Sequence, residues 1–437
     1  METRDANIAI VGGGSFNWSP KLLTDLACTP SLGGRLVLLD TNPRTLEVMV
    51  PLGRRAMREL GGNYDVTGTS RIEEALVGAD YVILTINTGG YEATRQDLEI
   101  PEKYGVFQSV GDTVGPGGLI RGMRNIPVIV GVAREMERRC PDAWLMNYSN
   151  PMCILTRAVT VATDIQVVGL CHELMSLEHR LMDIFDVEKE GHIEMKVGGI
   201  NHLGWVLEAR HQGRDLFPEL AEHIHSYEAP ELSYDYFSPY LDLCLIKYAL
   251  FEITGALGVA GDRHIAEFYS HFLSEESQYG WKYGVKRTTA DDYERDYLAA
   301  GEVAKATACG KEPLYGEKSG EVVFGVIESM EHDLGREFFV NLPNQGQIPI
   351  LPVGSIVETY AVADSSGLTP VTLGALPRGI AATCRLHSEI QEMIVQATLG
   401  EDERLALRAF LMDPLIRDFD AGRRMFAEMC GAQGLFR

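Results

Sequence analysis

Residues 7–16 read NIAIVGGGSF, a short apolar run that ends in a cluster of glycines. The run predicts a buried strand, and the segment 20–29 after it, PKLLTDLACT, has helical spacing. A second apolar run, RLVLLD at 35–40, ends in an acid. The three segments predict a strand–helix–strand unit, with which the later segments of the chain can be compared.

Further apolar runs follow this unit at the spacing of an α/β protein. They are ADYVILTIN at 79–87, AWLMNYSNP at 143–151 and IQVVGLCHE at 165–173, with a helical pattern at 126–140. Such alternation predicts a doubly wound, mostly parallel sheet with helices on both faces. Beyond about residue 172 the pattern is mixed, with strand-like 192–210 and helical stretches near 240–256 and 376–400. We therefore expect a Rossmann-like domain at 1–170 and a mixed α+β domain at 171–437.

The glycine cluster has a physical function in such a fold. Gly12 and Gly14 lack a Cβ atom, which lets the backbone approach a pyrophosphate at a helix N-terminus. Asp40 ends the next predicted strand, where a carboxylate can accept from both ribose hydroxyls and repel a 2′-phosphate. We expect NAD rather than NADP here, with Ser15, Phe16 and Asn87 also lining the site. A turn-forming or helix-capping role for Asp40 is the alternative.

Composition limits the class of partner and the compartment. The 437 residues carry a formal net charge of −23, which disfavours nucleic acids and anionic membranes as partners. A small molecule is the expected partner. The sequence contains no apolar run long enough to span a bilayer, and its eight cysteines show no paired spacing, so we expect a cytoplasmic protein.

A second constellation combines Cys171 at the end of a predicted strand with His202 in GINHLGW at 199–205. His172, Glu173, Asn150 and Asn201 lie next to these residues or at the same predicted sheet edge. One thiolate and one imidazole would leave positions open on a divalent cation for substrate oxygens. Core packing is the alternative for a cysteine or histidine of this kind.

A third cluster lies in GDRHIAEF at 261–268 and contains Asp262, Arg263, His264 and Glu267. The glycine before Asp262 marks a turn that could present the carboxylate to a cleft. Asp262 could equally act as a helix N-cap, because an acid at that position accepts from the free amides of the first turn.

Eight motifs, in order over nearly the whole chain, resemble glycoside hydrolase family 4. They are IVGGGS, VGDTVGPGGLIRGMRNIP, NYSNPMCILT, GLCHE, GINHLGW, GDRHIAEF, VNLPNQGQIPILP and LMDPL. The resemblance implies a fold like that of lactate and malate dehydrogenases, with bound NAD and usually manganese. It also implies glycoside cleavage by oxidation, elimination, water addition and reduction, outside the two-carboxylate scheme of most glycosidases.

The resemblance assigns a role to each candidate residue. Cys171 and His202 would hold the metal, which would polarise the C2 and C3 oxygens of the sugar. Asp262 would remove the C2 proton, with Tyr236, Tyr240 and Tyr248 as alternatives. Where several relatives carry an aspartate acid after the metal cysteine, this chain has His172 and then Glu173, so either could protonate the leaving group.

The Cys-His-Glu sequence is similar to that of members acting on uronides, namely α-glucuronides or α-galacturonides. Arg263 could then clamp the substrate carboxylate, with Arg95, Asn150 and Asn201 as further substrate contacts. The resemblance also implies a homodimer or homotetramer. An NAD-dependent hydroxy-acid dehydrogenase and a non-catalytic NAD-binding sensor are the alternatives from other functional classes.

Overall fold

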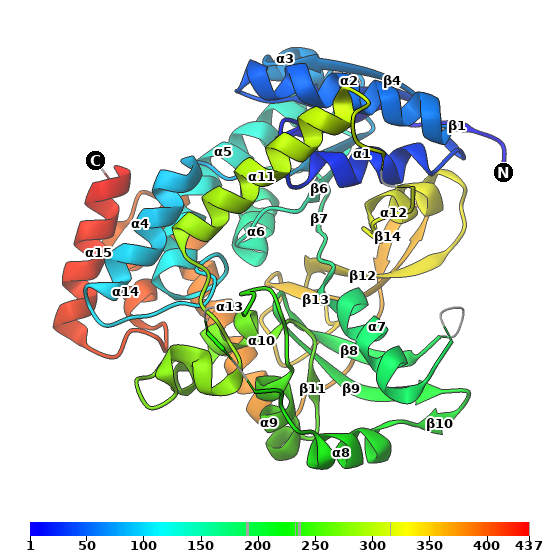
Figure 1. Ribbon diagram of the computed structural model, residues 1–437. Helices are drawn as coiled ribbons and strands as arrows, with labels where there is room; N and C mark the ends of the chain where they lie inside the picture. Colours follow the sequence, from blue (N-terminus) through cyan, green and yellow to red (C-terminus); the bar gives the residue numbers. More distant parts are fainter. Residues whose placement is uncertain (189–191, 232, 235–236, 315, 437) are drawn as a thin grey trace.

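The computed structural model of the chain describes residues 1–188, 192–231, 233–234, 237–314 and 316–436. Its first part is a parallel sheet with the strand order β4-β3-β2-β5-β6-β7, shown in Figure 1. The strands are β2 (Ile8–Val11), β3 (Leu32–Leu39), β4 (Asn63–Thr69), β5 (Tyr81–Leu84), β6 (Trp144–Asn147) and β7 (Val167–Gly169), with β1 (Arg4–Asp5) beside β3. This order is that of dinucleotide-binding domains and confirms the predicted Rossmann-like sheet.

Helices cover both faces of the parallel sheet. Side chains alternate along each strand, so Ile8 and Ile10 of β2 belong to one apolar core and Ala9 and Val11 to another. The helices of this half are α1 (Ser19–Ala27), α2 (Pro43–Leu60), α3 (Ile72–Ala75), α4 (Gly90–Glu102), α5 (Gly115–Arg139) and α6 (Met152–Ala162). Helices α1 and α2 contribute to the first core, and α5 and α6 contribute to the second.

The sheet continues beyond β7 with antiparallel strands. Asn341 of β12 pairs with Gly169 of β7, and β13, β8 and β9 follow in that order. The strands are β8 (Glu194–Ile200), β9 (Leu203–His211), β10 (Arg214–Asp215), β11 (Leu257–Gly258), β12 (Arg336–Pro343), β13 (Ile356–Asp364) and β14 (Gly367–Pro370). The expected boundary near residue 170 coincides with this change from parallel to antiparallel pairing. The division into two domains stays a prediction, since one sheet crosses the boundary.

The second half adds helices around this sheet. They are α7 (Glu173–Phe185), α8 (Phe217–Ser226), α9 (Leu245–Thr254), α10 (Asp262–Ile265), α11 (Ala290–Ala308), α12 (Val323–Glu331), α13 (Arg378–Leu399), α14 (Glu403–Leu411) and α15 (Phe419–Gln433). Short 3₁₀ helices are η1 (Ala266–Phe268), η2 (Ser270–Leu273) and η3 (Gln278–Tyr283). Helices α9 and α13 lie within the stretches that the sequence predicts as helical.

The C-terminal helices return to the N-terminal half. Helices α13, α14 and α15 contact α5, and α15 also contacts α4, so the red helices of Figure 1 lie beside the cyan ones. The apolar residues of α13, such as Ile390 and Ile394, are fully buried in the core that they share with α5 and α6. The described part of the chain contains no helix with the length and apolar character needed to cross a bilayer.

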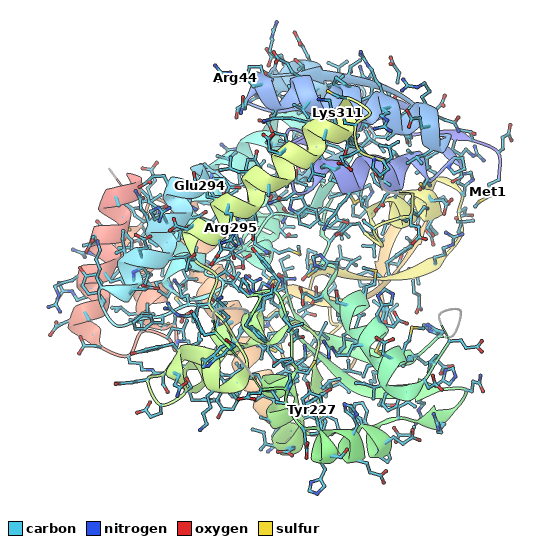
Figure 2. All side chains as sticks on the ribbon, in the orientation of Figure 1. Met1, Arg44, Tyr227, Glu294, Arg295 and Lys311 are labelled. Carbon is cyan, nitrogen blue, oxygen red and sulfur yellow. The ribbon has the colours of Figure 1, made fainter. Side chains whose placement is uncertain are left out.

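Helix α11, from the second half of the chain, packs against helices of the first half. It contacts both α2 and α4. In Figure 2, Glu294 and Arg295 mark its early turns near the middle of the molecule, and Lys311 follows its end near α2. The helix therefore runs across the region where the parallel strands end.

A buried ion pair fixes the segment that follows β5. Arg124 of α5 donates to both carboxylate oxygens of Asp97 on α4, at 3.0 and 2.8 Å, and its Nε donates to the Thr88 carbonyl oxygen. Gln433 of α15 donates to the same carboxylate at 2.7 Å. The side chains of Arg124 and Asp97 are only 8% and 1% exposed. Three helices thus share one buried charge pair.

We expect Arg124→Ala to lower the free energy of unfolding by roughly 3–5 kcal/mol, because it leaves the Asp97 carboxylate buried without its cation. Chemical denaturation followed by circular dichroism measures the change. Arg71→Ala is the control. The Arg71 guanidinium pairs with Glu73 and Glu74 at the surface, so its removal should change the free energy of unfolding only slightly. Equal stabilities of the two variants would contradict the expected role of the buried pair.

Candidate active site

The glycine turn after β2 lies beside the ends of β3 and β5. Gly12 has a φ of +89°, and a Cβ atom there would lie 2.4 Å from the Thr85 carbonyl oxygen, so the turn requires glycine. The Gly14 amide donates to Asp40 Oδ2 at 2.9 Å. The predicted residues Gly12, Gly14 and Asp40 lie at the carboxyl edge of the sheet, where the strand order reverses between β2 and β5.

Ser15 and Asn87 border this turn. Ser15 Oγ accepts from the Trp18 amide at 3.3 Å, just before α1 begins. Asn87 follows β5 at the same sheet edge and is exposed, with a long contact of 3.4 Å from its Nδ2 to Thr94 Oγ1. Both residues lie where a nucleotide would meet the sheet edge, and their contact with NAD stays a prediction.

Phe16 connects the glycine turn to α11. Its ring lies 5.0 Å from that of Tyr297, which also packs 5.4 Å from Tyr91 at the start of α4. Gly301 of α11 passes close to Phe16, since a Cβ on Gly301 would lie 2.9 Å from the Phe16 ring. Helix α11 therefore covers the predicted cofactor loop with aromatic side chains.

His202 lies in the turn between β8 and β9. Ile200 pairs with Leu203, so Asn201 and His202 alone make the connection. His202 adopts a φ of 62° and is 4% exposed. A Cβ on Gly199 would lie 2.3 Å from the Leu203 carbonyl oxygen, so the tight return depends on glycine in the GGINHLG segment.

Asp112 and His264 approach His202 from two other elements. Asp112 lies in the loop before α5, and His264 lies in α10. One ligand atom from each of the three residues lies within 4.8 Å of the others. Burial opposes ionisation of Asp112, but the charges of His264 and His202 lower its pKa to about 2. This group has the carboxylate and imidazole ligands of a divalent-cation site.

Hydrogen bonds hold this cluster in place. Thr113 Oγ1 donates to Asp112 Oδ1 at 2.6 Å and lies 2.8 Å from His202 Nδ1. Asn150, a predicted substrate contact, donates to Asp112 Oδ2 at 3.2 Å. His264 Nδ1 is buried and has no hydrogen-bond partner among the described residues.

Cys171 follows β7 and is half-buried. Burial, and then the charges of Glu358 and Glu173, raise the pKa of the Cys171 thiol well above its usual value. Cys171 is not a member of the three-residue cluster around His202. The structure therefore brings one predicted ligand, His202, together with Asp112 and His264, and direct ligation by Cys171 stays a prediction.

His172 and Glu173 differ in their surroundings. Glu173 Oε2 accepts from the Gly261 amide at 2.7 Å, which connects the start of α7 to the segment of Asp262. His172 is 41% exposed, and its ring nitrogens lie 3.8 Å from Glu173 and 3.6 Å from Glu321. Glu173 is thus the more enclosed of the two predicted acids.

Asp262 is buried and bonded to another helix. Its two carboxylate oxygens accept from the amides of Ile246 and Lys247, at 2.9 and 3.0 Å, in the first turn of α9. Burial and the charge of Asp242 raise the pKa of Asp262 to about 7. The capping alternative is therefore real, but the helix that Asp262 caps is α9 rather than its own. Its role as a base stays a prediction.

The two alternative tyrosines that the structure describes lie in different surroundings. Tyr240 donates to Asp296 of α11 at 2.9 Å, and its ring lies 4.9 Å from the guanidinium of Arg263. Tyr248 packs with His223 in a separate apolar cluster. Tyr236 lies outside the described residues. Of the described pair, only Tyr240 contacts a predicted substrate residue.

Arg263 and Arg95 have different partners. Arg263 donates to Thr288 Oγ1 at 2.7 Å and to Tyr293 OH at 3.2 Å, and its buried Nε has no partner among the described residues. Arg95 instead pairs with Glu99 and Asp291 where α4 meets α11. Substrate binding by Arg95 stays a prediction, and these ion pairs give its guanidinium a structural function.

Two buried carboxyl groups complete the site. Glu267 belongs to the third cluster of the sequence analysis but was given no role there, whereas Glu358 was missed, as was the placement of Asp112 and His264 beside His202. Glu267 Oε1 accepts from the amides of Val110 and Gly111, at 2.7 and 2.8 Å, and so holds the loop of Asp112. Burial raises the pKa of Glu267 to about 8. Both Asp112 and Glu267 lie in motifs quoted above, but no spacing rule connects residues 155 positions apart.

Glu358 of β13 is the second of these carboxyl groups. Its Oε1 accepts from Asn201 at 3.3 Å and from Asn341 at 2.8 Å. The predicted substrate residue Asn201 therefore has its amide nitrogen occupied by Glu358, while its Oδ1 has no partner among the described residues. Alternating polarity in a strand was the sole sequence signal for Glu358.

Taken together, the sheet edge carries a glycine turn with an acid, a cluster of cation-binding side chains and a partly unpaired arginine. The first arrangement suits a nucleotide, the second a divalent cation, and the third an anionic group. Such a site can bind a small polar substrate beside a dinucleotide.

Comparisons with known proteins agree with this arrangement. An α-galacturonidase of Thermoanaerobacterium saccharolyticum is 33% identical over 98% of this chain and 96% of that protein. The solved structure of a Bacillus subtilis glucosidase-like protein has a TM-score of 0.89 and 31% identity, covering 98% of this chain and all of that one. A 6-phospho-β-glucosidase of Thermotoga maritima, solved with manganese, NAD⁺ and glucose-6-phosphate, has a TM-score of 0.81 at 20% identity, covering 98% of each chain.

The family match covers both halves of the molecule. Residues 7–187 match the family 4 glycosyl hydrolases, and residues 197–416 match the C-terminal domain of that family. The two ranges include the glycine turn, the cation-binding cluster and Arg263. The chain is a member of glycosyl hydrolase family 4.

Proposed function

We propose that this protein hydrolyses α-uronides, with α-galacturonides as the first substrate class to test, and that it uses NAD and a divalent cation, manganese. The observation that carries the proposal is the cluster at the sheet edge, where Arg263 lies beside the residues suited to a cation and a cofactor. The 33% identity to an α-galacturonidase supports the same substrate class.

The cofactor would bind at the glycine turn, with Asp40 accepting from the ribose hydroxyls. Gly12 fits this role because no side chain can occupy its position, and Phe16 and Tyr297 would exclude water from one side. Bound NAD supplies a hydride acceptor that is regenerated within each turnover. The solved relative from Thermotoga maritima contains NAD⁺, in agreement with this assignment.

The cation would bind at His202, with Cys171 as the second ligand proposed from the sequence. His202 fits because a threonine hydroxyl holds its Nδ1, so that Nε2 remains for a ligand. A divalent cation supplies Lewis-acid polarisation of sugar hydroxyl and carbonyl oxygens.

Residues of this chain would fill two proton-transfer roles, a base and an acid. Asp262 would accept the C2 proton of the sugar, with Tyr240 as the alternative beside Arg263. Glu173 or His172 would protonate the departing glycosidic oxygen. Glu173 is connected to the Asp262 segment through Gly261, so the proposed acid and base are held by one hydrogen bond between α7 and α10.

Arg263 would clamp the substrate carboxylate. Thr288 and Tyr293 orient its guanidinium from one side, and Tyr240 covers its face. An arginine fixed in this way can offer a fork of N–H donors to a carboxylate. Asn150 and Asn201 lie close to the same cluster and would contact sugar hydroxyls.

We further propose a cytoplasmic homodimer or homotetramer. All eight cysteines are free, as a reducing compartment would require, and NAD is an intracellular cofactor. Light scattering of the purified protein would report the oligomeric state.

The decisive experiment measures turnover of aryl α-galacturonide, α-glucuronide and neutral α-galactoside in deuterated water. NAD, manganese and reductant are each omitted in turn. We expect uronide hydrolysis that needs both NAD and manganese, with deuterium at C2 of the released sugar, because elimination exchanges that proton. Hydrolysis without exchange, or NADH formed with each turnover, would contradict the proposal and favour a dehydrogenase.

Substitution of Asp40 tests the cofactor site. We expect Asp40→Ala to weaken NAD binding by roughly 10-fold or more and to reduce the preference over NADP, since a charge-assisted hydrogen bond is lost. Calorimetric titration with each nucleotide measures this. Asn42→Ala, which removes only the N-cap of α2, is the control. Unchanged NAD affinity in Asp40→Ala would refute the assignment.

Substitution of Arg263 tests the substrate class. Arg263→Lys should reduce kcat/KM for the uronide by roughly 30-fold or more, because lysine cannot make the bidentate contact. The loss on a neutral α-galactoside should be much smaller. Arg287→Lys is the matched control, since Arg287 also stacks on an aromatic ring and pairs with Glu102. Equal losses on both substrates would argue against a carboxylate clamp.

A further inference from the structure

Glu321 is a buried carboxyl group outside the set of residues that the proposed reaction uses. It lies two residues before α12, and its side chain is only 5% exposed. Its Oε2 is buried and has no hydrogen-bond partner among the described residues. Burial raises the pKa of Glu321, and the charges of His172 and Lys21 oppose that rise. A buried carboxyl group without a donor is costly, so a partner is expected here.

Two neighbouring residues fix the place of this carboxyl group. Ser319 donates to both carboxylate oxygens of Asp25 on α1, through its amide and its hydroxyl, each at 2.6 Å. Gly320 has a φ of +88°, and a Cβ atom there would lie 2.5 Å from Met175 Sδ on α7. The segment is therefore bound to α1 and packed on α7, the helix that begins directly after His172.

His172 is the cationic partner within reach of Glu321. Its Nδ1 lies 3.6 Å from Glu321 Oε1, and no lysine or arginine among the described residues pairs with that carboxylate. Its Nε2 lies 3.8 Å from Glu173 Oε1, and the Trp18 ring lies 6.3 Å from the imidazole. Both nitrogen–oxygen distances exceed those of hydrogen bonds. Catalytic hydrogen bonds are often this long without substrate and shorten when it binds.

The two carboxylates beside His172 differ in their other partners. Glu173 Oε2 accepts from the Gly261 amide at 2.7 Å, which holds Glu173 to another segment. Burial and the charge of Glu321 raise the pKa of the Tyr148 hydroxyl well above its usual value, so that hydroxyl stays a donor. A donor at that place suits Glu321 Oε2 and leaves Oε1 for His172.

We propose that Glu321 is a positioning residue for His172, whose Nδ1–H it binds so that Nε2–H is directed toward the substrate. The inference rests on the proposed function, in which His172 and Glu173 are the two candidate acids, and it selects His172. The proton passes from Nε2 to the glycosidic oxygen as the C1–O bond breaks with its electron pair on that oxygen. The C2 carbanion supplies the pair of the new C1–C2 double bond, and the imidazole is left neutral. A carboxylate beside an imidazole orients it and stabilises its cationic form.

The first test reports on the contact itself, without substrate or turnover. Long-range ¹H–¹⁵N correlation spectra of the full-length protein, labelled at histidine, show which ring nitrogen carries the proton of a neutral imidazole. His172→Gln assigns the signal. We expect Nδ1–H in the wild type and its loss in Glu321→Gln, which keeps the shape of the side chain but removes the charge. Glu331→Gln is the matched control, because Glu331 accepts from Tyr81 at the far end of α12.

The second test measures hydrolysis of dinitrophenyl and phenyl α-galacturonide. Dinitrophenolate leaves without a proton, whereas the phenyl oxygen needs one to leave rapidly. We expect Glu321→Gln to lower kcat on the phenyl substrate by roughly 100-fold, with KM unchanged, because a positioned acid contributes about that much. The loss on the dinitrophenyl substrate should be much smaller. Glu321→Gln combined with His172→Gln should be no slower than His172→Gln alone, because the two residues act as one unit.

An unchanged His172 tautomer in Glu321→Gln would overturn the inference, as would equal losses on the two substrates or no loss on either. Thermal unfolding shows whether each variant is folded, and Glu321→Asp, which withdraws the carboxylate by one methylene, replaces Glu321→Gln if the latter is not. A wild-type protein with Nδ1–H on His172 that hydrolyses no uronide would uphold the contact and refute the proposed function alone.

Discussion

The buried carboxyl group of Glu358 lies at the junction on which the site depends. Its Oε1 accepts from Asn341 of β12 and from Asn201 of the β8–β9 turn. Asn341 is also the residue through which β12 joins the parallel sheet at Gly169. One 3% exposed side chain thus fixes both the point where the sheet changes direction and the turn that presents His202. Burial raises the pKa of Glu358 to about 7, so these two amides hold a group whose ionisation is otherwise opposed.

The parallel half of the fold could be predicted from local patterns, because apolar runs and helical spacing are short-range signals. The glycine turn and Asp40 were predicted for the same reason, since strand, turn and acid follow one another within 34 residues, from Asn7 to Asp40. The hydrogen bond between the Gly14 amide and the Asp40 carboxylate forms within this local unit, without a distant segment of the chain. His202 was predicted through its motif, and its tight turn is also local.

The remainder of the site depends on contacts between distant segments. Asp112 and His264 are 152 positions apart, and the packing of the Asp112 loop against α10 and η1, through Ser109 and Glu267, brings them together. Asp262 lies in a motif that predicted either a base or a cap, and the helix that it caps could not be identified from sequence. The ion pair of Arg95 with Asp291 depends equally on how α4 and α11 dock. Burial and long-range packing, rather than residue type, decided these outcomes.

Tyr293 and Tyr297 lie one turn apart on α11. Tyr293 holds the guanidinium of Arg263, and Tyr297 packs on Phe16 of the glycine turn. A shift of this helix that moved both side chains on filling one pocket would therefore alter the free energy of filling the other. Thermodynamic linkage makes that coupling reciprocal. If a bound nucleotide strengthens the binding of a sugar acid, the sugar acid strengthens the binding of the nucleotide by the same factor.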